Sequence, residues 1–381
     1  MLSIDKYNDR FHNDVVPEEL KSGFSFRLFR KRLRFRLKGG PTVEPGASFW
    51  ILTAMVFVFT YVNGFHDGCN VVATLIASRA MRPHPALAWA AVVEFLSPFS
   101  ILVIGSSVSD TIKKLVGESY YTASDVRGTA LAFITAGILA AILWNLTTWR
   151  FGIPASSSHA LIGGVVGAGI AAFGTGAISW SYFWGKVVLM IFLTPAISFA
   201  AGFLILRLLL LLTRHATVGV NQFFKYAQWV NMTFLAFNHS FNDSQKSIGI
   251  ILILMGIYGN ESSGIPLWAI VCAAACLACG IAFGGFKIIK TVGTGIYKVQ
   301  PIHSFASQLA AGSVILGASL LGAPVSASQI VSSSIMGVGS AQRYKAVHWA
   351  VAGRILTSWF ITIPIAGMVG GVLFLVLSLI F

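Results

Sequence analysis

The sequence predicts an all-α membrane protein that crosses the bilayer many times. Of its 381 residues, 56% are hydrophobic and 10% are charged, whereas a soluble domain carries about 25% charged residues. Long apolar runs recur along the chain, and most approach the roughly 20 helical residues that cross a hydrocarbon core. The runs are continuous rather than alternating, which favours helices over a β-barrel. We therefore expect about 10–12 transmembrane segments, some of them partial.

The net charge of +14 comes from basic residues in short segments at the ends of the apolar runs and in an N-terminal arm, residues 1–46. This distribution indicates cytoplasmic anchoring rather than nucleic-acid binding. Within the arm, the segment 27–38 holds seven Lys or Arg and no acid. We expect the arm to be cytoplasmic, as a topology signal or as an amphipathic segment on anionic lipid. It lacks the apolar core of a signal peptide.

Two acids interrupt long apolar runs. Asp67 lies in the stretch 65–70, and Asp243 lies in the stretch 241–247. A charged side chain costs roughly 2.5–3.5 kcal/mol at the bilayer centre and is rarely present there without a function. Glycines flank the first acid, so a helix broken at mid-membrane is expected at 63–68, with the same kind of break around Asp243. Two such interruptions indicate a transport site.

Other titratable or metal-binding side chains stand in apolar surroundings. Glu94 has apolar residues on both sides, which predicts ion coordination or proton handling, with helix tethering as the alternative. His66 either titrates near neutral pH or serves as a plain hydrogen-bonding partner. The four cysteines are expected to be packing residues, with a metal site built from the last three as the weaker alternative. They are Cys69, Cys272, Cys276 and Cys279.

A motif of proline followed by serines occurs twice. The segment 152–159, GIPASSSH, aligns position for position with 322–329, GAPVSASQ. Each motif runs into an apolar helix, so its hydroxyls, free amides and helix dipole could bind an oxyanion. The alternative is N-capping alone, which needs one serine per helix. The serines concerned are Ser156, Ser157, Ser158, Ser326 and Ser328.

The two acids and the two serine motifs follow each other at similar spacing, which predicts two repeats. The first repeat would span 47–206 and the second 226–381, joined by a linker at 207–225. Counting of crossings leaves their relative orientation open. An inverted pair with its site at the midplane is the usual arrangement in transporters.

Four segments of the chain resemble the inorganic phosphate transporter (PiT) family, and in particular its bacterial low-affinity branch. They are NGFHDGCNVVATLIASRAM, WNLTTWRFGIPASSSHALIGGVVG, AFNHSFNDSQKSIGIILI and GAPVSASQIVSSSIMG. They occur in order in both halves, so the resemblance covers about 47–381. It implies an inverted-repeat symporter that moves phosphate with a cation across the bacterial plasma membrane, without enzymatic activity or a cofactor. A homo-oligomer is compatible with it.

The resemblance also implies roles for individual residues. Asp67, Asn70 and Asp243 match cation-binding positions, while the five serines match positions that face phosphate. Asn242 precedes the second acid, where the first half has His66. Lys246 occupies the position equivalent to Asn70, so an ammonium could stand where a sodium ion would bind, either pairing with Asp243 or binding phosphate, which favours proton coupling. Gln329 replaces the expected second histidine, which argues against a symmetric relay with His159.

Phosphate carries about one to two negative charges, so it cannot bind beside ionised Asp67 and Asp243 without a compensating cation or proton. This requirement favours proton-coupled symport, with Glu94 or His66 assisting. Sodium coupling, sulfate transport, a metal–phosphate complex and a passive anion channel are the alternatives. A serine hydrolase built on Ser156 and His159 is opposed by Gln329 in the second copy.

Overall fold

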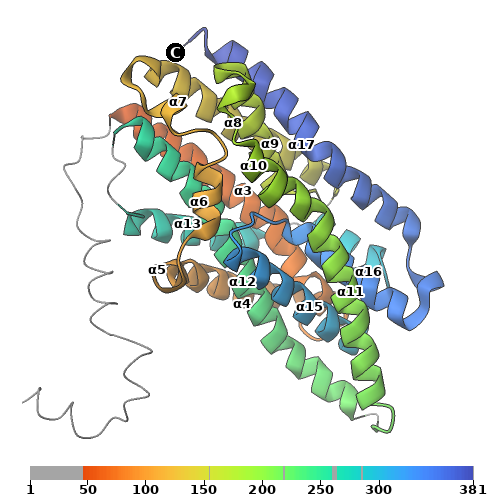
Figure 1. Ribbon diagram of the computed structural model, residues 1–381. Helices are drawn as coiled ribbons and strands as arrows, with labels where there is room; N and C mark the ends of the chain where they lie inside the picture. The colour runs from red at the N-terminus through yellow and green to blue at the C-terminus, as the bar shows by residue number, and fades with distance from the viewer. Residues whose placement is uncertain (1–45, 154, 218, 260–263, 285, 381) are drawn as a thin grey trace, which may run out of the picture.

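The computed structural model describes residues 46–153, 155–217, 219–259, 264–284 and 286–380, and every regular element among them is helical (Figure 1). The basic arm lies outside the described residues except for Gly46. The main helices are α3 (Ala47–Ala77), α4 (Pro83–Leu96), α8 (Arg127–Arg150), α9 (Ser157–Phe173), α11 (Leu189–Leu212), α12 (Val220–Ile257), α13 (Leu267–Phe283), α15 (Pro301–Leu320), α16 (Ala327–Arg343) and α17 (Trp349–Leu377). The shorter ones are α5 (Ile101–Ile104), α6 (Ser107–Lys113), α7 (Ser119–Thr122), α10 (Trp180–Tyr182) and α14 (Phe286–Lys290), with a π-helical turn η6 at Thr291–Gly295. The predicted all-α class is confirmed.

Several helices are long and apolar enough to cross a membrane. Among the described residues five pass on length and composition, and a sixth is added if the bent pair of α13 and the segment Ile288–Gly295 forms one span. The five are Ala47–Ala77, Pro83–Ile104, Arg127–Phe151, Trp180–Leu212 and Trp349–Leu377. This number is below the roughly 10–12 segments, some of them partial, that the sequence predicts. Helices α9 and α16 have 17 residues each and are shorter than a full span of about 20 residues.

Helices α3 and α12 lie side by side and run antiparallel. At one end the Ser48 hydroxyl is 2.6 Å from the Tyr258 hydroxyl, and at the other Ser78 donates to Gln228 at 2.9 Å. Between these ends Thr60 donates to Ser247 at 2.7 Å. The two interrupted runs of the sequence therefore meet near the middle of both helices.

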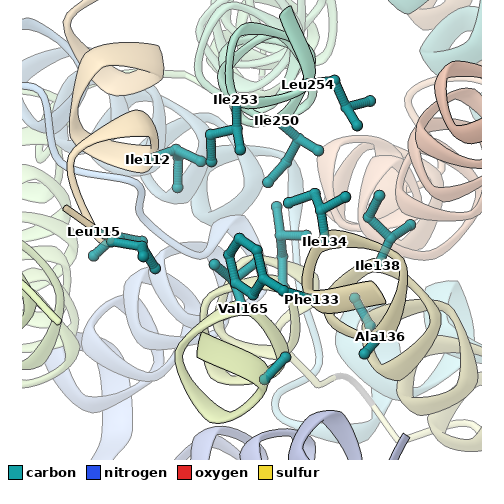
Figure 2. Close-up of a cluster of buried hydrophobic side chains, with 14 of the residues drawn as sticks. Ile112, Leu115, Phe133, Ile134, Ala136, Ile138, Val165, Ile250, Ile253 and Leu254 are labelled. Atoms are coloured by element: carbon teal, nitrogen blue, oxygen red, sulfur yellow. The ribbon is translucent and has the colours of Figure 1, made fainter. Parts of the chain in front are cut away.

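A polar layer separates two apolar clusters along this pair of helices. The first cluster includes side chains between Phe49 and Phe59 of α3 and between Ile250 and Ile257 of α12, together with Tyr258 and with residues of α6, α8 and α9. Figure 2 shows Ile112, Phe133 and Val165 in it. The second cluster includes Cys69–Leu75 of α3 and Met232–Ala236 of α12. The polar layer is the part of α3 and α12 between these two clusters, and it contains the buried acids Asp67 and Asp243.

The predicted break at 63–68 is wrong, as is the corresponding break around Asp243. Helix α3 continues through Gly64 and Gly68, and α12 continues through Asp243. The glycines serve close packing instead of unwinding: a Cβ on Gly64 would stand 2.5 Å from the Leu277 carbonyl oxygen of α13, and one on Gly68 would stand 2.9 Å from Ile281. Small residues let membrane helices approach closely in this way.

Helices α9 and α16 each pack on a helix of the other half of the chain. A Cβ on Gly167 of α9 would stand 2.0 Å from the Gly367 carbonyl oxygen of α17. At the matching position of α16, a Cβ on Gly337 would stand 2.0 Å from the Phe199 carbonyl oxygen of α11. Helix α9 of the first half therefore packs on α17 of the second, and α16 of the second half packs on α11 of the first, through glycine contacts. The serine motifs at the starts of α9 and α16 are thus positioned by helices from both halves.

The two ends of the helix bundle differ in charge. The end marked by Ser78, where α3 ends and α12 begins, carries many basic residues and, among the described residues, no acid. They are Arg79, Arg82, Arg150, Arg214, Lys225, Lys290, Lys298, Arg343 and Lys345. The opposite end mixes Asp110, Glu118 and Asp125 with bases. The positive-inside rule thus favours the Ser78 end as cytoplasmic. If α3 crosses the membrane once, the arm before its start would lie on the other side, which conflicts with the expectation of a cytoplasmic arm.

The glycine contacts predict which small substitutions unfold the protein. Gly167→Ala and Gly337→Ala each push a methyl group into a backbone oxygen. We therefore expect each variant to have a free energy of unfolding lower by about 1–3 kcal/mol or more, and a lower Tm. Gly317→Ala is the matched control, because nothing lies within 4 Å of a Cβ at this exposed position of α15. A melting curve of each purified variant is the measurement. Unchanged melting of both test variants would contradict the packing.

Candidate functional site

The candidate site is the polar layer where α3, α12 and the starts of α9 and α16 meet. Its ionisable side chains are shielded from solvent: Asp67 is 0% exposed, Asp243 is 1% exposed and Lys246 is 1% exposed. Glu94 of α4 and the serines of both motifs are buried as well. Buried charges must be paired or hydrogen-bonded, so the contacts of each acid define the site.

In the second half, Lys246 neutralises Asp243. The two residues are three positions apart on α12, which places them on one face, and the ammonium donates to Asp243 Oδ1. It also donates to the Ser158 hydroxyl of α9 and, at 3.0 Å, to the Val325 carbonyl oxygen before α16. All three hydrogens of the ammonium therefore have acceptors. Lys246 joins α12 to both serine motifs.

The other oxygen of Asp243 faces His239 and Asn63. His239 Nε2 lies 3.2 Å from Asp243 Oδ2, and its Nδ1 lies 2.8 Å from Glu94 Oε1. Asn63 donates to the same Asp243 Oδ2 at 2.9 Å. His239 is thus hydrogen-bonded to Glu94 and lies at ion-pair distance from Asp243, and α3 is linked to α12 through one amide.

In the first half, a histidine, a serine and no Lys or Arg contact Asp67 among the described residues. His66 Nδ1 lies 3.0 Å from Asp67 Oδ1, and its Nε2 lies 3.1 Å from the Thr148 hydroxyl of α8. The Ser157 hydroxyl contacts Asp67 Oδ2 and, at 2.5 Å, Asn63 Oδ1. No Lys or Arg contacts Asp67 among the described residues. The two acids therefore differ: Asp243 has a permanent cation beside it, and Asp67 does not.

These contacts form one continuous network across the polar layer. Starting at Glu94, it passes through His239, Asp243 and Asn63 to Ser157, and ends at Asp67, His66 and Thr148. Within this network, Asn63 is the link between the two acids. A change of charge at either acid can be transmitted to the other through this amide and the start of α9.

The two serine motifs bind each other reciprocally. Ser158 donates to the Val325 carbonyl oxygen at 2.8 Å, and Ser328 donates to the Ala155 carbonyl oxygen at 2.7 Å. Ser158 matches Ser328 in the two motifs, and Ala155 matches Val325. The starts of α9 and α16 are therefore joined by a symmetric pair of hydrogen bonds. Any ligand that accepts these two hydroxyl hydrogens must break the bonds that join the motifs.

The first serine of each motif is an N-cap. Ser156 Oγ accepts from the His159 amide at 3.1 Å, and Ser326 Oγ accepts from the Gln329 amide at 3.4 Å. Capping thus accounts for these two serines, while Ser157, Ser158 and Ser328 make the contacts described above. The Ser156 hydroxyl makes no contact with the His159 ring, and His159 Nδ1 has no hydrogen-bond partner among the described residues. This geometry does not support a serine hydrolase.

Two of the predicted residues lie beside the network rather than within it. Asn70 donates to the backbone oxygen of Asp67 at 3.1 Å, and its Oδ1 has no partner among the described residues. Asn242 donates to the Ser319 hydroxyl at 2.8 Å and to the Ala323 carbonyl oxygen at 3.2 Å. Asn242 therefore braces the loop before α16.

Sequence reasoning missed Asn63, His239 and Thr148. Asn63 and His239 each lie four residues before an acid, and this spacing places both on the helix face of that acid. In an unwound stretch, a spacing of four residues does not place two side chains on one face. The glycines around Asp67 predict such an unwound stretch. Thr148 is contributed by α8, and nothing in the sequence indicates which helix faces His66.

Comparisons with known proteins identify a family. The model of the phosphate transporter family matches residues 63–370. A relative from Bacillus subtilis, named as a probable low-affinity inorganic phosphate transporter, is 36% identical over 339 residues, covering 87% of this chain and 98% of the relative. One of the same name from Rhizobium meliloti is 34% identical over 333 residues, covering 86% and 96%.

A solved structure named "The sodium-dependent phosphate transporter" superposes with a TM-score of 0.79, covering 88% of this chain and 100% of that one. At 22% identity it shows the shared fold. The names of these proteins agree with the expectation that the chain is not an enzyme. Taken with its apolar helices, the match over most of its length shows that this multi-pass membrane protein belongs to the phosphate transporter family.

Proposed function

We propose that the chain is a secondary active symporter of inorganic phosphate that uses protons as the coupling ion. The observation that carries this proposal is the difference between the two acids. Lys246 pairs with Asp243 at a site where a bound cation would otherwise be required, whereas Asp67 has no Lys or Arg beside it among the described residues. A proton is the simplest partner for Asp67 in such a buried position, because it removes the charge altogether.

Counting of hydrogens supports a proton on Asp67. The Ser157 hydroxyl has one hydrogen but two oxygen neighbours, Asn63 Oδ1 and Asp67 Oδ2. Asn63 cannot turn its amide nitrogen toward Ser157 without losing its bond to Asp243. If Asp67 is protonated, it donates to Ser157 and Ser157 donates to Asn63, so both contacts are hydrogen bonds. A single added proton at this position therefore completes the network.

The anion would bind between the starts of α9 and α16. In the present arrangement Ser158 and Ser328 donate to carbonyl oxygens across the two motifs. When the motifs separate, these hydroxyls and the free amides at the two helix starts can turn to phosphate oxygens. Lys246, which already contacts Ser158, would contribute the positive charge. Phosphate binding thus requires both a proton on the site and the opening of the motifs. The proton and phosphate therefore favour each other's binding, and the size of this effect is their coupling free energy.

We also propose that the chain consists of two inverted repeats, 47–206 and 226–381, joined by the segment 207–225, which includes the end of α11 and the start of α12. Helices α3 and α12 carry equivalent motifs and run antiparallel, as an inverted pair would. The reciprocal serine bonds and the matched glycine contacts of α9 and α16 support the same relation. Rocking of one half against the other would expose the site to alternate sides.

Uptake of labelled phosphate into proteoliposomes tests the coupling ion. We expect an inward proton gradient to drive accumulation without sodium, because Lys246 removes the need for a cation at Asp243. Sodium-dependent accumulation would contradict proton coupling and agree with the sodium dependence in the name of the solved relative. Excess sulfate and added magnesium, in separate samples, distinguish sulfate transport and a metal–phosphate complex from the proposal.

The variant Asp67→Asn separates coupling from binding. Its amide can donate to Ser157 as a protonated Asp67 would, but it cannot release a proton. We therefore expect proton-driven accumulation to be abolished, while exchange of internal for external phosphate continues. Asp110→Asn, at an exposed position of α6, is the control and should behave as wild type. Normal accumulation by Asp67→Asn would show that the coupling proton binds elsewhere.

A further inference from the structure

A basic cavity lies outside the polar layer, at the Ser78 end of the molecule. It has a volume of about 890 Å³ and is lined by the end of α3, the turn η6, and the start of α15. Three of its lining residues, Arg79, Lys290 and Lys298, are exposed cations. None has a carboxylate within 4.0 Å among the described residues, and the described acids all lie in the polar layer or near the opposite end. The cavity therefore has a positive potential that the described acids do not neutralise.

The helix start at one wall adds to this potential. Helix α15 begins at Pro301, and both Pro301 and its N-cap, Gln300, line the cavity. The N-terminus of a 20-residue helix carries a partial positive charge. Its first amides are partly satisfied by a capping box between Gln300 and His303, so the three side-chain charges are the main feature that favours an anion and the helix dipole adds to them.

Arg79 adopts a backbone conformation that is unfavourable for arginine. Its φ is 59°, and it is the only non-glycine residue with a positive φ among those the structure describes. It follows the end of α3 at a position where glycine is usual, and a side chain costs about 1–2 kcal/mol in this conformation. Such strain is typical of positions kept for function. The strain is consistent with a role for the Arg79 cation in the cavity.

Beside the cations, the cavity wall has polar residues, Ser78, Thr294, Gln300 and His348, and an apolar part. Ile76 of α3, Ile289 of α14 and Val299 contribute to the apolar part. A small inorganic anion would gain nothing from these side chains, whereas an amphiphile would contact both parts of the wall. Cavities of this kind between membrane helices on the basic side of a protein suit the head groups of anionic lipids.

We propose that this cavity binds the phosphate head group of an anionic phospholipid, with Arg79, Lys290 and Lys298 around the phosphate and an acyl chain along Ile76 and Ile289. The site is separate from the polar layer but shares α3 with it. A bound lipid would hold the end of α3 against η6, where a Cβ on Gly293 would stand 2.6 Å from the Ala73 carbonyl oxygen. Lipid composition would thereby affect the helix that carries Asp67.

Binding of fluorescent phosphatidylglycerol to the purified full-length protein in phosphatidylcholine nanodiscs tests this site. The variant Arg79→Gln/Lys290→Gln/Lys298→Gln should bind it at least about tenfold more weakly than wild type, since each base near a membrane surface contributes substantially. The control Arg214→Gln/Lys225→Gln/Lys345→Gln removes three exposed charges at the same end, none of which lines the cavity. Equal weakening in both variants, or none in the first, would overturn the proposal.

Two further measurements separate the alternatives. Arg79→Gly relieves the strained backbone, so it should raise Tm while weakening binding of phosphatidylglycerol; raised Tm with unchanged binding would overturn the role of Arg79. Inorganic phosphate is added in excess to the wild-type complex as a competitor. Retention of the lipid supports the lipid site, and displacement would show that the ligand is the free anion instead.

Discussion

The requirement that a carboxylate buried in a membrane protein be neutralised determines the arrangement of the whole polar layer. Asp67, Asp243 and Glu94 stand between two apolar clusters, out of reach of solvent. Each is met by side chains from at least one other helix, so α3, α4, α9 and α12 are bound together at one level. Removal of one partner from such a site leaves an uncompensated charge, which costs several kcal/mol.

The same requirement explains how an anion could be coupled to a proton. The Lys246 ammonium pairs with the Asp243 carboxylate and also donates to Ser158, so one cation contacts both the second acid and a serine motif. Asp67 has His66 and Ser157 beside it and no Lys or Arg among the described residues, and its contact with Ser157 is complete once a proton is bound. A difference between two otherwise matched halves is therefore what gives the proposed transport cycle its proton dependence.

Much of this site could be predicted from the sequence, because acids and serine motifs in apolar runs are rare and repeat in order. The starts of α9 and α16 follow directly from the capping serines. The expected break at 63–68 was wrong because glycines permit both unwinding and close contact, and only the position of α13 against Gly64 and Gly68 decides between them. The break around Asp243 was expected by analogy with the first and was wrong with it. His239 and Asn63 were missed for the same reason, since their spacing has meaning only on an intact helix. The reciprocal bonds of Ser158 and Ser328 depend on tertiary contact between distant segments, which no local pattern reveals.

The most direct test of the role of Lys246 is phosphate uptake by the variant Lys246→Asn, which gives the second half the amide that Asn70 provides in the first. Uptake is measured in proteoliposomes under a proton gradient and under a sodium gradient separately. The account predicts that the proton gradient alone no longer drives accumulation and that sodium restores it, because Asp243 then needs a cation. Proton-driven accumulation at the wild-type level without sodium would contradict it.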